Sequence, residues 1–401
     1  MATGKPDLPK LYPVGGFKLG TASAGIKTPG RPDLVIMEAI QGSSVAAIFT
    51  KNSFCAAPVI VCKERLSRSQ PRYFVTNTGN ANAGTGEQGL LDATSTCSSL
   101  ASLAGVDIDS VLPFSTGVIG ELMPMEKIRA ALPGAFNNLN ESGWEEAATG
   151  ILTTDTRPKG SSVRFGDYNP ITITGIAKGS GMIKPNMATM LAYIATDASV
   201  DQELLHSALV RANERSFNRI TVDSDTSTND SVVLVATGTS GITIDENSFD
   251  EFVEHLTNTF INLAQSIIRD AEGATKFVAV VVDTARSRSE ALAIAYSVAE
   301  SPLVKTALSA SDPNWGRILA AIGRSAVEDL DVNNVQILLN SVLIADHGAR
   351  ANSYSEESGQ MAMQPEDIEI RICLNRGNIS ETVWTSDLTY EYVRINAEYR
   401  T

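Results

Sequence analysis

One segment of the chain concentrates residue types that could do chemistry. It runs from Lys178 to Leu191 and reads Lys-Gly-Ser-Gly-Met-Ile-Lys-Pro-Asn-Met-Ala-Thr-Met-Leu. Gly179 and Gly181 permit backbone conformations that a side chain would forbid, and Pro185 fixes its own φ and extends the residue before it. Such a loop can hold one peptide bond and one hydroxyl group in a strained, reactive arrangement. On composition alone, the competing interpretation is a β-turn with a lysine in solvent.

The histidines argue against the common hydrolase mechanisms. The chain has three, His206, His255 and His347. A Ser-His-Asp or Cys-His hydrolase needs a histidine close to its nucleophile. The first two lie in predicted helices, where surface or core roles are usual. His347 lies in a predicted loop, but no Gly-x-Ser-x-Gly elbow accompanies it. Acyl chemistry in this chain therefore needs a different base.

A glycine-rich loop offers a second kind of site. Gly84-Thr-Gly-Glu-Gln-Gly89 matches the dinucleotide-binding pattern Gly-x-Gly-x-x-Gly, between a strand-like run and a predicted helix. Seven residues separate the loop from the end of that strand. Asp107 and Asp109, the acids near the expected spacing, precede the next strand instead of ending it. A nucleotide-binding or structural protein built on this loop remains the alternative from another class.

No metal site is predicted. The segment from Asp223 to Asp230 resembles a calcium loop, but Thr228 occupies the sixth position, where an EF-hand needs glycine. Turn and hydrogen-bonding roles are therefore favoured for it. The cysteines form no Cys-x-x-Cys pair and have no histidine at zinc-ligand spacing. They are interpreted as free thiols in a reducing compartment; they are Cys55, Cys62, Cys97 and Cys373.

The 178–191 segment resembles the ornithine acetyltransferase (glutamate N-acetyltransferase) family of arginine biosynthesis, and the likeness runs through nearly the whole chain. Further segments resemble landmarks of that family, in the same order: 77–83, 115–120, 153–156, 223–230, 272–276, 312–317 and 396–401. In that family the protein cuts its own Ala-Thr bond, and the new N-terminal threonine is the nucleophile. The matching residues here are Ala188 and Thr189.

The resemblance implies a self-cleaving acetyltransferase. Thr189 Oγ would attack the carbonyl carbon of Ala188, and hydrolysis of the resulting ester would leave an α chain, 1–188, and a β chain, 189–401. The freed α-amino group, with a reference pKa of about 7.7–8.0, could act as base for its own hydroxyl group, which removes the need for a histidine. The acetyl group of N-acetylornithine would move to Thr189, and glutamate would then take it.

The resemblance also implies the residues around this nucleophile. The oxyanion hole would be the Thr116 hydroxyl and the Gly117 backbone N–H, on the turn after a strand at 111–114. Lys178 would bind the substrate α-carboxylate and Glu272 its side-chain ammonium group. Further substrate-binding positions are Thr153 or Thr154, Thr189 itself, Asn396 and Thr401. Adjacent strand residues face opposite sides, so only one of the two threonines would point inward.

The expected partners are small molecules. The resemblance implies no cofactor and leaves open whether acetyl-CoA serves as a second acetyl donor. It implies that the α and β chains stay associated as a heterotetramer with two of each. The competing enzyme is an amidase or aminopeptidase that uses the same N-terminal nucleophile with water as acceptor.

Short strand-like runs alternate with amphipathic helical segments, which is typical of an α/β or α+β fold. The predicted strands are 35–37, 46–49, 73–76, 111–114, 171–176, 190–195, 231–236, 277–282, 335–339 and 368–373. The predicted helices are 90–104, 125–135, 202–217, 290–299, 317–322 and one that starts at Ser248. The resemblance implies an α/β fold in which two stacked sheets lie between helix layers (αββα), with a second, smaller α/β domain. The structural domains would combine segments of both chains.

Length and composition agree with such an enzyme. A chain of 401 residues is long enough for two or three domains. Its 43% hydrophobic and 19% charged residues exclude an intrinsically disordered protein. The net charge of −14 argues against nucleic acid as the main partner. The first twelve residues lack the apolar core of a signal peptide, and no apolar run reaches membrane-spanning length. We therefore expect a soluble, cytoplasmic protein without a membrane partner.

Overall fold

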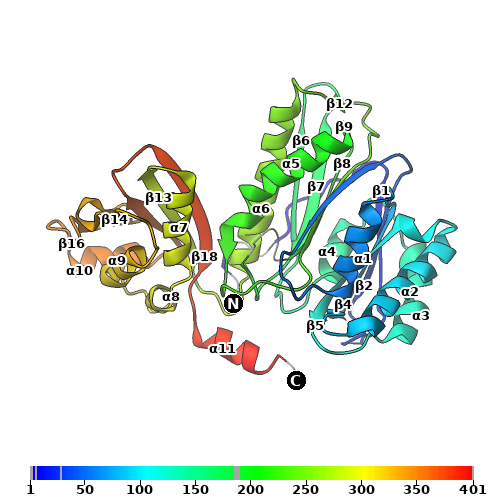
Figure 1. Ribbon diagram of the computed structural model, residues 1–401, viewed down its shortest axis with the longest axis horizontal. Coiled ribbons are helices and arrows are strands. Elements are labelled where there is room, and N and C mark those ends of the chain that lie inside the picture. The colour runs from blue at the N-terminus through cyan, green and yellow to red at the C-terminus, as the bar shows by residue number, and fades with distance from the viewer. Residues whose placement is uncertain (1–2, 5–6, 28, 185–189, 400–401) are drawn as a thin grey trace. The chain divides into compact units, whose positions relative to one another are not determined.

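The computed structural model describes residues 3–4, 7–27, 29–184 and 190–399, which fold into two compact units (Figure 1). The larger unit comprises Asp7–Asn218 and Thr226–Ile267. The smaller unit comprises Met1–Pro6, Arg219–Asp225 and Ile268–Thr401. Ala188, Thr189 and Thr401, three of the predicted site residues, lie outside the described residues.

The larger unit contains a four-stranded sheet in its described part. The strand order is β1-β2-β4-β5, with β4 and β5 parallel and the other pairs antiparallel. The strands are β1 (Phe17–Ala22), β2 (Leu34–Ala39), β4 (Tyr73–Asn80) and β5 (Val111–Val118). Side chains alternate between the two faces. Leu34 and Ile36 pack with α2 (Gly86–Ala104) and α3 (Met125–Asn137) in one core, and Val35 and Met37 pack in another.

A five-stranded sheet faces the first one across that second core. Its order is β3-β11-β8-β7-β6. The strands are β3 (Ser44–Phe49), β11 (Ser231–Ala236), β8 (Leu191–Thr196), β7 (Ile171–Lys178) and β6 (Lys159–Phe165). The central strands β7, β8 and β11 are buried along their whole length, which explains their almost unbroken apolar runs. Tyr193 and Val233 share the core with Phe17 and Phe74 of the other sheet.

Helices complete the layers of this unit. Those on the outer side of the five-stranded sheet include α5 (Gln202–Glu214), which packs on β3 and β11, and α6 (Phe249–Arg269), whose Leu263 lies against β7. The shorter helices α1 (Ala57–Leu66) and α4 (Trp144–Gly150) add Cys62 and Trp144 to the core between the sheets. The two remaining short strands, β9 (Ser199–Val200) and β12 (Thr243–Ile244), pair with each other. The predicted αββα arrangement is confirmed.

The smaller unit is a second α/β domain, as predicted. Its described part holds a seven-stranded sheet of order β10-β18-β13-β17-β14-β15-β16. The strands are β10 (Ile220–Thr221), β18 (Ile379–Ser386), β13 (Phe277–Ala285), β17 (Asp367–Cys373), β14 (Gln336–Leu339), β15 (Val342–Asp346) and β16 (Ala349–Arg350). The helices are α7 (Arg288–Ala299), α8 (Pro302–Ser309), α9 (Trp315–Gly323), α10 (Glu356–Met363) and α11 (Tyr390–Ala397). Helices α7 to α10 share one apolar core with the sheet.

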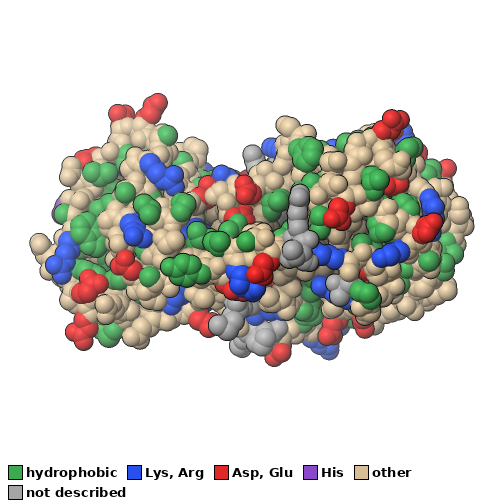
Figure 2. All heavy atoms as spheres, turned by 90° about the horizontal axis from the view of Figure 1, so that it is seen from below, with side chains coloured by type: hydrophobic (Ala, Val, Ile, Leu, Met, Phe, Trp, Pro, Cys, Tyr) green, Lys and Arg blue, Asp and Glu red, His purple; other side chains and the backbone are tan. Residues whose placement is uncertain are grey.

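The surface of the described residues is mixed in charge. On the face drawn in Figure 2, blue basic and red acidic side chains lie interspersed among polar and apolar ones. Within the described ranges, no helix combines the length and the apolar character needed to span a bilayer.

Candidate active site

The end of β7 brings three of the predicted site residues together in the larger unit. Lys178, the last residue of β7, is 9% exposed. Its Nζ donates to Thr153 Oγ1 at 2.6 Å and to Thr116 Oγ1 at 3.2 Å. A predicted carboxylate ligand, a predicted substrate-binding hydroxyl and a predicted oxyanion donor thus form one hydrogen-bonded cluster.

A buried carboxylate, that of Asp155, lies next to this cluster and binds its backbone and its lysine. Asp155 accepts hydrogen bonds from Lys159 Nζ (2.6 Å), Gly179 N (2.7 Å) and Thr153 N (3.1 Å). Lys178 Nζ lies 3.9 Å from its Oδ2. Burial alone would raise the pKa of Asp155, but the ammonium groups of Lys159 and Lys178 hold that pKa well below its usual range. Asp155 therefore remains charged and fixes the backbone at the start of the 178–191 segment.

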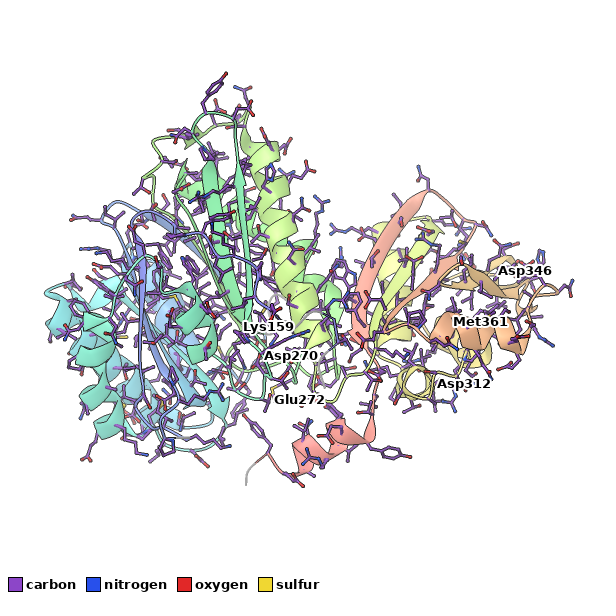
Figure 3. All side chains as sticks on the ribbon, turned by 180° about the vertical axis from the view of Figure 1, so that it is seen from behind. Lys159, Asp270, Glu272, Asp312, Asp346 and Met361 are labelled. Carbon is purple, nitrogen blue, oxygen red and sulfur yellow. The ribbon has the colours of Figure 1, made fainter. Side chains whose placement is uncertain are left out.

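Neither member of the buried pair was predicted as a site residue from the sequence. Lys159, labelled in Figure 3, is the first residue of β6, and its side chain is almost completely buried beside Asp155. Asp155 and Lys159 are four residues apart, a spacing at which opposite charges often form an ion pair in a helix. The two residues lie in a loop and a strand instead of a helix, so this spacing could not be interpreted before the fold was known.

Thr116 and Gly117 lie within β5, which corrects the expectation of a turn after residue 114. β5 continues to Val118 because it keeps pairing with β4, through an irregular register at Gly79 and Asn80. Gly117 has φ of +138°, and a Cβ atom there would lie 2.2 Å from the carbonyl carbon of Gly79. Only glycine permits so close an approach of two backbones.

The two threonines before Asp155 have different partners. Thr153 Oγ1 accepts the hydrogen bond from Lys178, whereas Thr154 Oγ1 is hydrogen-bonded to Ser180 Oγ at 2.7 Å. They lie in the connection between α4 and β6, not in a strand. Both are tied to the 178–191 segment, each at a different residue of it.

In the smaller unit Asn396 lies against Glu272. Asn396, on α11, donates from Nδ2 to Glu272 Oε2 at 2.7 Å. Glu272 is buried in the turn that follows α6, next to Asp270 in Figure 3. Gly273, with φ of +70°, lets α11 approach, and its carbonyl accepts a bond from Thr389 Oγ1 at 2.8 Å. The last helix is therefore anchored in this unit.

The other motifs have structural roles in the part of the chain that is described. Asn229 donates from Nδ2 to the carbonyls of Ala81 (2.6 Å) and Ser115 (2.8 Å), so the 223–230 segment is a hydrogen-bonded loop. Helix α2 begins at Gly86, inside the glycine-rich motif, and Gly89 O accepts a bond from Asn82 Nδ2. Among the described residues, no group of three or more His, Cys, Asp or Glu could hold a metal ion.

Relatives of known name match the chain over its full length. The curated "Arginine biosynthesis bifunctional protein ArgJ" of Pseudomonas fluorescens (strain Pf0-1) is 55% identical over 406 residues, covering 100% of both chains. The protein of the same name from Methylococcus capsulatus is 52% identical, covering 98% of this chain and 97% of that relative.

The chain is also similar to solved structures. The crystal structure of the arginine biosynthesis bifunctional protein ArgJ of Bacillus halodurans is similar with a TM-score of 0.50 and 38% identity. The match covers 52% of this chain and 99% of the Bacillus halodurans chain. The structure of Mycobacterium tuberculosis ornithine acetyltransferase complexed with ornithine is 32% identical, with a TM-score of 0.41. That match covers 44% of this chain and 94% of the Mycobacterium tuberculosis chain. The family model described as "ArgJ family" matches residues 18–401. Together with the full-length identities, this match shows that the chain is an enzyme of the ArgJ family.

Proposed function

We propose that the chain is a self-processing acetyltransferase of arginine biosynthesis that moves the acetyl group of N-acetylornithine to glutamate. Family membership supports the pathway, and the names of the curated relatives describe bifunctional proteins of arginine biosynthesis. The observation that carries the proposal is the cluster in which Lys178 binds Thr153 and Thr116 beside Gly117. It combines one cation for a carboxylate with a hydroxyl group that can face a developing oxyanion.

The proposed nucleophile is Thr189. Its Oγ attacks the carbonyl carbon of Ala188, the C–N bond breaks, and the acyl group moves from nitrogen to oxygen. Water then hydrolyses the ester, which frees the Thr189 hydroxyl and leaves its α-amino group unblocked. In the first transfer this amine takes the Thr189 hydroxyl proton as the acetyl group arrives and gives it to the leaving ornithine amine. In the second it takes a proton from the attacking glutamate amine and returns it to Thr189 Oγ as the acetyl group leaves. The exchange of ornithine for glutamate then follows ping-pong kinetics.

The hydrogen bond from Lys178 leaves the Thr116 hydroxyl group able to donate to an oxyanion. A lysine ammonium group only donates, so the oxygen of Thr116 is the acceptor in their 3.2 Å contact. The Thr116 hydroxyl proton therefore points elsewhere, and we propose that it and the Gly117 N–H bind the oxyanion of the tetrahedral intermediate. Donors fixed in advance in this way are usually worth about 10²–10³ in rate.

Charge assigns the remaining roles. The proposed substrate carries an α-carboxylate, for which Lys178 is the partner, and ornithine carries a side-chain ammonium group, for which Glu272 is the partner. Thr153, Thr154, Asn396 and Thr401 complete the proposed binding positions. A second donor, acetyl-CoA, would account for the word "bifunctional" in the relatives' names. The heterotetramer with two copies of each chain is part of the same proposal.

Isotope transfer separates this function from an amidase or aminopeptidase. The purified protein is incubated with N-acetylornithine labelled in the acetyl group, with and without glutamate. The proposal predicts labelled N-acetylglutamate when glutamate is present and little free acetate when it is absent. Rapid release of acetate without glutamate would show that water is the acceptor and would contradict the proposal.

A further inference from the structure

The connection between β18 and α11 is bound to the turn that carries Glu272. Asp387 follows β18 directly and is 3% exposed. Its Oδ1 accepts hydrogen bonds from the backbone N–H groups of Thr275 (2.8 Å) and Lys276 (3.0 Å). Its Oδ2 accepts from Thr275 Oγ1 at 2.5 Å. Because these residues end the 272–276 motif, one buried carboxylate fixes the backbone just after Glu272.

The same connection holds the motif at a second point, Gly273. Thr389 Oγ1 donates to the carbonyl of Gly273 at 2.8 Å, and it also accepts from Glu391 N at 3.2 Å as the N-cap of α11. A Cβ atom on Gly273 would lie 2.7 Å from Tyr392 N, so the first turn of α11 packs directly on this glycine. Glu272 is therefore followed by backbone that is held at two points.

A buried lysine of α8 fixes the connection itself. Lys305 is 3% exposed, and its Nζ donates to Thr385 Oγ1 at 2.8 Å and to the carbonyl of Ser386. Its own carbonyl accepts from Leu388 N at 3.1 Å. Burial lowers the pKa of Lys305 to about 8, and Asp387 is the carboxylate that opposes this lowering most strongly. Asp387 thus stands on backbone that α8 holds in place.

This arrangement joins the two residues of the proposed ammonium subsite. Glu272 is buried and accepts from Asn396 Nδ2 at 2.7 Å, and Asn396 lies on α11. Charge-assisted hydrogen bonds weaken when distance and direction are poor. We propose that Asp387 is a positioning residue of this subsite: it fixes the turn that carries Glu272, and so sets where the Glu272 carboxylate meets the substrate ammonium group. This inference rests on the proposed role of Glu272 in binding N-acetylornithine.

The two proposed substrates differ at the group that Glu272 would bind. N-acetylornithine carries a side-chain ammonium group, whereas glutamate carries a side-chain carboxylate. In ping-pong kinetics, kcat/KM for each substrate reports its own half-reaction. A displaced Glu272 should therefore lower kcat/KM for N-acetylornithine and not for glutamate. A general loss of folded enzyme would lower both by the same factor.

The test compares Asp387→Ala with Asp387→Asn. The alanine removes all three hydrogen bonds, whereas the asparagine keeps an oxygen for the two backbone N–H groups. Both variants lose the charge that faces Lys305, so a fall in stability is common to them. We expect kcat/KM for N-acetylornithine to fall about tenfold in Asp387→Ala, with no fall for glutamate. Asp387→Asn should keep the wild-type values for both substrates.

The matched control is Asn340→Ala. Asn340 also joins two segments of the smaller unit, because its Oδ1 accepts from Glu369 N (2.8 Å) and its Nδ2 donates to the carbonyl of Ala362 (2.9 Å). Neither contact involves the 272–276 motif. This control should lose stability and leave the ratio of the two kcat/KM values unchanged.

A second pair of variants serves if Asp387→Ala does not fold. Thr389→Ala removes the hydrogen bond to Gly273, and Thr389→Ser keeps a hydroxyl group that can make it. The same selective fall for N-acetylornithine is expected in the alanine variant, with recovery in the serine variant. Equal kinetics in the two Thr389 variants would overturn the proposal.

Two outcomes for Asp387 also overturn it. An unchanged ratio of the two kcat/KM values in Asp387→Ala would make the residue merely structural. Equal selective falls in Asp387→Ala and Asp387→Asn would show that charge matters and the backbone bonds do not. In both cases Glu272→Gln should still show a selective fall for N-acetylornithine.

Failure of the proposed function gives a different result. If Glu272→Gln lowers neither kcat/KM selectively, the role of Glu272 is refuted, and the role of Asp387 falls with it. If the wild type forms no labelled N-acetylglutamate from acetyl-labelled N-acetylornithine, the acetyltransferase function itself is refuted. These two measurements therefore separate a wrong function from a wrong assignment of Asp387.

Discussion

Asp155 and Asp230 are two buried carboxyl groups at the same edge of one sheet, and their pKa values move in opposite directions. Asp155 receives hydrogen bonds from an ammonium group and two backbone N–H groups, and a second ammonium group lies within 4 Å. Asp230 keeps an oxygen without a donor in the described part of the chain. Burial is common to both, so the neighbouring ammonium groups and hydrogen-bond donors decide the charge. The first carboxylate is satisfied by its donors, whereas one oxygen of the second has no donor among the described residues.

The largest effect should follow from Asp155→Asn. This change removes the negative charge between Lys159 and Lys178, and it replaces one acceptor oxygen by an amide group that cannot accept from either lysine. Breaking a buried ion pair from one side costs about 3–5 kcal/mol. We therefore expect the free energy of unfolding, measured in urea at pH 7, to fall by about that amount. A loss under 1 kcal/mol would mean that the pair is not buried in solution.

Thr116→Val should mainly affect catalysis. The substitution keeps the shape and removes the hydroxyl group that Lys178 contacts. Loss of one oxyanion donor predicts a fall in kcat of about 10²–10³, measured by N-acetylglutamate formation. The control is Ser115→Ala, on the same strand, whose hydroxyl donates to Asn77 instead. Equal losses in both variants would argue against a specific role for Thr116.

The two carboxyl groups should also give opposite pH dependences of stability. Because the folded-state pKa of Asp155 is lowered, its stabilisation is present above the unfolded value of about 3.9 and disappears as the pH falls below it. Because the folded-state pKa of Asp230 is raised, its contribution is lost as the pH rises above that value.

The uncleavable background Thr189→Ala keeps the chain in one piece for this comparison. Adding Asp230→Asn should increase the free energy of unfolding at pH 7, because the asparagine removes a carboxyl group whose ionisation is opposed by burial. The gain should vanish near pH 3, where both residues are uncharged. Urea titrations at the two pH values measure it. A loss of stability at pH 7 would show that Asp230 is a satisfied carboxylate like Asp155.

The smallest expected effect lies in the smaller unit. Asn396→Ala removes the 2.7 Å hydrogen bond to the buried Glu272. A hydrogen bond to a charged group is worth about 1.5–3 kcal/mol, so we expect KM for N-acetylornithine to rise at least about tenfold with little change in kcat. Arg394→Ala, which breaks exposed ion pairs of the same helix, should leave KM unchanged. A shift in kcat alone would contradict a binding role for Asn396.

The strands that were predicted best are those whose sequences are continuous apolar runs. Strand β11 was predicted at its observed bounds and β8 to within one residue, because buried central strands need nothing but apolar side chains. Helix α1 and strand β18 were not predicted. Pro58 stands in the first turn of α1, where proline fits a helix but also resembles a loop signal. β18 carries polar side chains on an incompletely buried strand.

The site was only partly predictable. Motif resemblance identified Lys178, Thr116, Gly117, Glu272 and Asn396, and the structure brings the first two together and the last two together. Asp155 and Asp230 both stand in quoted motifs, but their charge depends on which donors reach them after folding. Those donors come from β6 and β7 for Asp155, and from its own loop for Asp230. No local pattern encodes these distances.

The proposed mechanism depends most directly on whether the chain is cut before Thr189. Intact-mass analysis of freshly purified, active protein, combined with N-terminal sequencing, measures it. We expect two polypeptides that correspond to 1–188 and 189–401, the second beginning with an unblocked threonine, and a single 401-residue chain in Thr189→Ala. Full transferase activity in a preparation that contains only the uncut chain would contradict it.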